Sequence, residues 1–168
     1  MNTVAQKIKD AFEQKDWSQV ILLTENEVLK PAYDALTIEY SVADIGDIPN
    51  EKVFEYFAKH DIGSVLLMKG TAALGSGDPM LASRMFADAQ NSSNDDMMLA
   101  TAYMLDAMCK LGLSNDTTTA HDDLVQAKKH DPSIGTRIDT IYNTYISSAG
   151  SDMFASQKEE VKKQLELL

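Results

Sequence analysis

The residues of this chain that could carry chemistry are one cysteine, three histidines and scattered carboxylates. Cys109 would be a reactive thiolate only beside a basic group that lowers its pKa, and Lys110 points to another side of the same helix. The triplet His121-Asp122-Asp123 has residue types that suit metal binding or acid–base catalysis, but adjacent helical residues point in different directions. We therefore predict a buried, inert thiol and a solvated helix face at these two places.

No wider catalytic or metal-binding pattern is present in the sequence. His60, His121 and His130 are too far apart to form a zinc motif, and neither a phosphate-binding loop nor a nucleophile elbow occurs. The sequence therefore gives no support for an enzyme, and we expect no catalytic residue, no metal ion and no cofactor.

Methionines are concentrated in the middle of the chain. Because methionine is flexible and polarisable, such a cluster either fills a helical core or forms an adaptable binding surface. Both interpretations stay open from the sequence, and helical spacing with leucine favours the core. Seven of the nine methionines are involved: Met68, Met80, Met85, Met97, Met98, Met104 and Met108.

Charge and composition restrict the class of partner. The 168 residues carry a formal net charge of −11, which repels nucleic-acid phosphates and anionic lipids. The longest apolar runs, such as Val20–Leu23, have four residues, so we expect no membrane insertion. A single cysteine fits a reducing compartment, so we expect a cytoplasmic location. A protein or peptide partner is predicted, and a homo-oligomer stays open.

Helical periodicity and turn residues predict an all-α fold. Prolines and glycines are few, and most lie where the apolar periodicity is interrupted. We expect ten helices, the second of which ends before Lys30-Pro31. Because the connections are short, sequential helices should form five antiparallel hairpins, with first helices near residues 3, 31, 62, 95 and 133. We predict one domain over residues 1–168, built as stacked hairpins.

One stretch has the spacing of a known repeat. Its small residues would let two helices cross at short distance, and its aromatic residue would fill the space beside them. The residues are Leu66, Gly70, Ala73, Gly77, Ala82, Phe86 and Ala89, followed in the next hairpin by Ala120, Leu124, Ala127 and Pro132. This order resembles the tetratricopeptide repeat over about residues 62–132, although Met108 stands where the family has glycine and the spacing between hairpins is longer than usual.

The resemblance implies a short right-handed solenoid that binds a partner in a concave groove. Carrying the family's groove positions to this chain places Ser64, Leu67 and Thr71 on one repeat and Ala102, Leu105 and Cys109 on the next. Leu67 and Thr71 are unsuited to clamping a C-terminal carboxylate, as one subclass of the family does. An apolar groove suits an amphipathic helix or an extended hydrophobic segment.

The C-terminal part, about residues 133–168, is predicted to cap the array. Its last helix is mostly charged, as the solvent-facing end of a repeat protein requires. Alternatively, the stripe Val161, Leu165 and Leu168 docks a partner helix.

Three functions fit this description. The first is an adaptor that binds a partner in the groove. The second is a small acidic chaperone for a secreted or aggregation-prone client, and the third is an architectural subunit of a larger assembly.

Overall fold

The computed structural model describes residues 3–168, and throughout that range the chain forms helices and turns without a β-strand. The prediction of an all-α fold is thereby confirmed. None of the helices in this range is long and apolar enough to cross a membrane. The α-helices are α1 (Val4–Glu13), α2 (Trp17–Thr24), α3 (Lys30–Glu39), α4 (Asn50–Lys59), α5 (Ile62–Gly75), α6 (Pro79–Ala89), α7 (Asp96–Cys109), α8 (Thr117–His130), α9 (Ile138–Tyr145) and α10 (Ala155–Leu167).

Short polar side chains precede several helices and cap their first amide groups. The Thr3 hydroxyl accepts a hydrogen bond from the Gln6 amide at 3.1 Å, and the Asp16 carboxylate accepts one from Gln19. Asp78 and Asp95 cap α6 and α7 in the same way. These side chains satisfy amide groups that have no partner within the helix, which fixes where each helix starts.

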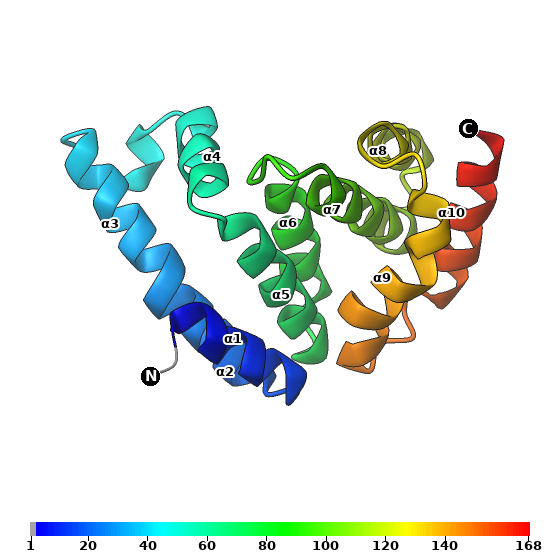
Figure 1. Cartoon of the computed structure of the whole chain (residues 1–168), viewed down its shortest axis with the longest axis horizontal. Helices are drawn as coiled ribbons and strands as arrows, with labels where there is room; N and C mark the ends of the chain where they lie inside the picture. Colours follow the sequence, from blue (N-terminus) through cyan, green and yellow to red (C-terminus); the bar gives the residue numbers. More distant parts are fainter. Residues whose placement is uncertain (1–2) are drawn as a thin grey trace.

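The predicted helix break before Pro31 is wrong. α2 continues through a π-helical segment, Glu25–Leu29, directly into α3, so residues 17–39 form one long helix (Figure 1). In the π segment the Lys30 amide donates to the Glu25 carbonyl, five residues earlier. This offset pairing and the wider turn accommodate a proline ring and its missing N–H, both of which would disrupt a regular α-helix. The first two predicted hairpins are therefore not separate units.

The middle of the molecule consists of two antiparallel hairpins, α5–α6 and α7–α8, which we call the central hairpins (residues 62–130). Gly70 of α5 lies against the Phe86 ring of α6, and a Cβ atom on Gly70 would come within 2.5 Å of that ring. Phe86 and Ala82 are completely buried. The predicted close helix crossing is therefore present, because only glycine leaves room for the aromatic ring.

The remaining helices lie on opposite sides of the central hairpins (Figure 1). The N-terminal arm (residues 4–59, α1–α4) contacts α5 mainly through α2, with smaller contacts from α1 and α4. The C-terminal segment (residues 134–167) contains α9, α10 and two short 3-10 helices, and it packs on α5, α7 and α8. Because α9 touches α5 as well as α10, the hairpins do not simply follow one another in a row.

Candidate functional site

Five of the six predicted groove residues are buried. The exposed fraction is 1% for Leu67 and 0% for the other four, which are Thr71, Ala102, Leu105 and Cys109. Ser64, near the start of α5, is exposed. The surface on which we expected a partner to bind is therefore closed in this structure.

The chain's own C-terminal segment packs on α5 and α7, the helices that carry these residues. The Thr71 hydroxyl donates to the Tyr145 carbonyl at 2.7 Å, and Arg137 donates to the Thr101 hydroxyl of α7 at 3.1 Å. Phe154, completely buried, lies against Gly112 in the π-helical segment Lys110–Ser114 that follows α7. Because apolar side chains on α5 and α7 gain free energy when they leave water, a C-terminal segment that reaches them will cover them. This segment takes the place that the sequence analysis gave to a partner.

Cys109 lies in the core, as predicted. Its exposed fraction is 0%, and burial, with a smaller contribution from the Asp106 carboxylate, raises the pKa of the thiol far above its usual range. The thiolate is therefore disfavoured in the folded protein.

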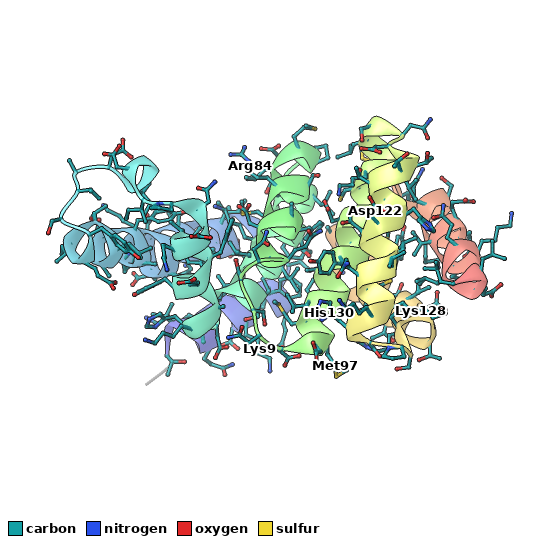
Figure 2. All side chains as sticks on the ribbon, turned by 90° about the horizontal axis from the view of Figure 1, so that it is seen from above. Lys9, Arg84, Met97, Asp122, Lys128 and His130 are labelled. Carbon is teal, nitrogen blue, oxygen red and sulfur yellow. The ribbon has the colours of Figure 1, made fainter. Side chains whose placement is uncertain are left out.

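The triplet at 121–123 is divided between solvent and core. His121 and Asp122 are exposed, and Figure 2 shows Asp122 on the outer surface of α8. Asp123 is buried, and its carboxylate accepts a hydrogen bond from Lys110 at 2.8 Å. Lys110 also pairs with Asp106 at 3.1 Å, which in turn accepts from Gln90. Two buried carboxylates therefore share one lysine at the interface of α7 and α8.

The shared lysine and the close carboxylates change the pKa values of Asp123 and Lys110. Burial first, and then the neighbouring Asp106 carboxyl, raises the pKa of Asp123. Lys110, which faces both carboxylates, has a pKa above its ordinary value because its hydrogen bonds to them outweigh desolvation. Every member of the network has a partner, so we assign it to the packing of α7 against α8 rather than to catalysis.

The other histidine contact is on the surface. His130, at the end of α8, bonds to Asp96 at 2.8 Å and stacks on the Tyr103 ring; Figure 2 shows it close to Met97. Within residues 3–168 no three histidine, cysteine or carboxylate side chains converge in a way that would hold a metal ion.

The methionine cluster is also divided. Met85, Met104 and Met108 are in the core, and Met68 and Met98 are half-buried. Met80 and Met97, exposed by 68% and 56%, lie on different helices. The core interpretation therefore holds for three of the seven, and only Met68 lies at an apolar pocket.

That pocket has a mainly apolar lining, and we call it the arm pocket. It has a volume of about 420 Å³ and lies between α1, the π segment with the start of α3, and the end of α4 with the first half of α5. Its apolar wall comes from all three sides, and Ser64 reaches its edge. Among its apolar residues, Val4, Val28 and Met68 are partly exposed, whereas Ile8 and Val65 are buried beneath them.

The charged residues at the arm pocket are acidic. Glu27 comes from the π segment and Asp61 from the α4–α5 turn, and the lining contains neither lysine nor arginine. The His60 ring stacks on Tyr56, with centroids 4.1 Å apart, along the same edge. The site is thus an apolar hollow with a negative rim.

A second hollow, of about 660 Å³, lies between α4, α6 and α7, but its character is polar. Arg84, which projects from α6 in Figure 2, lines it together with Asp106 and Lys110. Because Asp106 and Lys110 are already bonded to one another, this hollow offers a weaker basis for recognition than the arm pocket.

Sequence reasoning found only Ser64 of the residues at the arm pocket. Helical periodicity predicts that the helices around it form, but it shows only that a helix face is apolar and not what lies opposite that face. The pocket depends on the continuous helix through Pro31, which the sequence analysis did not anticipate. Comparison with known proteins adds nothing here: no protein family, no curated protein and no solved structure matches this chain.

Proposed function

We propose that this chain is a non-catalytic protein–protein interaction module that takes a hydrophobic segment of a partner protein into the arm pocket. The observation that supports the proposal most directly is the pocket itself, an open apolar hollow of about 420 Å³ formed by three separate parts of the chain. Exposed apolar hollows with a polar rim are typical of sites that bind proteins or ligands.

The likeness of residues 62–132 to tetratricopeptide repeats supports the same class of function. In this proposal the binding surface is formed jointly by the N-terminal arm and by α5, which ties it to the rigid central hairpins. The face that the family uses as a groove is covered here by the C-terminal segment, so the partner binds elsewhere.

The test is an affinity capture from native lysate with three proteins: the wild type, Met68→Arg and Met80→Arg. Met68 is at the arm pocket, whereas Met80 is 68% exposed on α6 outside it. We expect a partner that the wild type and Met80→Arg retain and that Met68→Arg loses, because a charged side chain in an apolar pocket must be desolvated.

Circular dichroism must show the same helicity for all three proteins. A partner retained by a folded Met68→Arg protein would contradict the proposed site. A partner lost by both variants would move the interface to a surface that includes α6.

A further inference from the structure

The lining of the arm pocket also specifies the chemistry of what it binds. We infer that the arm pocket recognises an amphipathic helix that carries lysine or arginine beside its apolar face, so that these cations lie at Glu27 and Asp61. This inference rests on the proposed function and gives it a partner of defined character.

The shape of the site indicates a helix. The hollow is bounded by helices on its three sides, and residues 3–168 contain no strand edge to which an extended peptide could add. A helical ligand satisfies its own main-chain hydrogen bonds and needs only an apolar surface to bury its apolar face. The half-buried Met68 can adapt to side chains of different shape.

The charge of the site indicates a basic ligand. Glu27 and Asp61 are both exposed, and neither forms an ion pair within the chain's described residues. The whole chain, at −11, attracts a cationic ligand and slows the approach of an anionic one.

The two carboxylates should not contribute equally. Asp61 stands at the amino end of α5, where no side chain caps the first amide groups, so their partial positive charge offsets part of its negative charge. Glu27 is in the middle of the long helix and has no such compensation. Glu27 should therefore attract the cation more strongly than Asp61.

The test uses two synthetic helical peptides of equal length, labelled for fluorescence anisotropy. Both carry leucine along one face, at positions i, i+3, i+4 and i+7. The charged residues beside that face are all lysine in one peptide and all glutamate in the other. At physiological salt we expect the lysine peptide to bind at least about tenfold more tightly than the glutamate peptide.

Charge-reversal variants separate a local contact from the field of the whole protein. Glu27→Lys and Asp122→Lys change the net charge equally, but Asp122 is on the outer surface of α8, away from the arm pocket (Figure 2). We expect Glu27→Lys to weaken lysine-peptide binding about fivefold, Asp61→Lys less, and Asp122→Lys less than about twofold.

The outcomes distinguish this inference from the proposed function. Equal weakening by Glu27→Lys and Asp122→Lys, equal affinity for both peptides, or no binding of the lysine peptide overturns the inference. If both peptides bind equally and Met68→Arg abolishes both, the arm pocket remains a docking site without a preference for cations. If Met68→Arg changes neither affinity, the site itself is wrong.

Discussion

The central hairpins and the N-terminal arm are both built from helices but differ strongly in burial. In α5, 11 of 14 residues are buried, including residues on every side of the helix. In α4, Phe57 is the one buried residue among 10. A helix surrounded by other helices resists local opening, whereas one held by a single stripe of contacts opens at lower free energy. Stability is therefore concentrated in the centre, and the arm leaves more surface exposed, including its side of the arm pocket.

One polar contact joins the two regions. Lys69 of α5 is 5% exposed and forms an ion pair with Glu25 in the π segment. Burial, and secondly the Arg84 guanidinium, lowers the pKa of Lys69. The pair holds the long helix of the arm in register on α5, next to the arm pocket.

The difference in burial between the two regions predicts its largest effect on stability for two equally buried leucines, one from each region. Leu66 in α5 and Leu36 in α3 are exposed by 2% and 1%. Leu66→Ala should lower the free energy of unfolding by about 4 kcal/mol, because the surrounding helices cannot close the cavity. Leu36→Ala should cost about 2 kcal/mol or less, because the end of the arm can relax. Urea denaturation measures both, and equal losses would contradict the difference between the regions.

The second prediction concerns the Glu25–Lys69 pair. Glu25→Ala removes the ion-pair partner of the buried Lys69, leaves only the longer-range attraction of Asp88, and should cost about 3 kcal/mol, with amide hydrogen exchange rising first in the arm. The double variant Glu25→Ala, Lys69→Met removes the uncompensated charge and should recover most of that loss. A double variant as unstable as Glu25→Ala would show that the pair contributes little to joining arm and centre.

The third prediction compares two glycines in or beside the C-terminal contacts. A Cβ atom on Gly112 would come within 2.5 Å of the Phe154 ring, whereas a Cβ atom on Gly135 would meet nothing within 4 Å. Gly112→Ala should cost about 2 kcal/mol through overpacking, and Gly135→Ala should be neutral or slightly stabilising. Thermal unfolding of both variants checks this, and a neutral Gly112→Ala would mean that Phe154 is not held rigidly against α7.

The smallest predicted effect depends on pH. Burial and the nearby Asp106 raise the pKa of Asp123 to about 7, so the folded chain binds a proton that the unfolded chain has released. Stability contributed in this way is present at low pH and is lost as the pH rises from about 4 to 7. The urea midpoint of the wild type should fall over this window, and that of Asp123→Asn should fall less.

Burial also raises the pKa of Asp88, so Asp88 contributes a further loss of stability as the pH rises. The Asp123→Asn variant keeps the Asp88 contribution, so its difference from the wild type reports on Asp123 alone. Asp131 and Asp139 have lowered pKa values, so they stabilise the folded protein at neutral pH. That stability is lost only when the pH falls far enough to protonate them in the folded protein. Identical pH profiles for the wild type and Asp123→Asn would exclude the shared lysine as the source of the effect.

Local features of the fold were predictable because they depend on neighbours in the sequence. Thr3, Asp16, Asp78 and Asp95 cap the helices that they precede, since each needs only an amide two or three residues further on. The small residue at Gly70 and the ring of Phe86 meet as expected, because a short turn joins their helices. Pro31 misled the prediction because the usual rule for proline assumes a regular α-helix, and a π turn relieves that restriction.

The candidate site was not predictable in the same way. The resemblance to tetratricopeptide repeats assigned Leu67, Thr71, Ala102, Leu105 and Cys109 to a groove, and all five are apolar or weakly polar residues that suit a core equally well. The sequence analysis predicted that Asp123 is solvated with its neighbours His121 and Asp122. It is buried because Lys110 and Asp106, which come earlier in the chain, lie beside it and pair with each other and with Asp123.

The sequence by itself determined that this chain is helical, where most helices begin, and that α5–α8 pack as tight hairpins. Only the tertiary structure decided that the C-terminal segment covers α5 and α7, that Asp123 is buried, and that the arm pocket stays open. The physical reason is that periodicity and capping act over a few residues, whereas burial depends on which distant face each apolar surface meets.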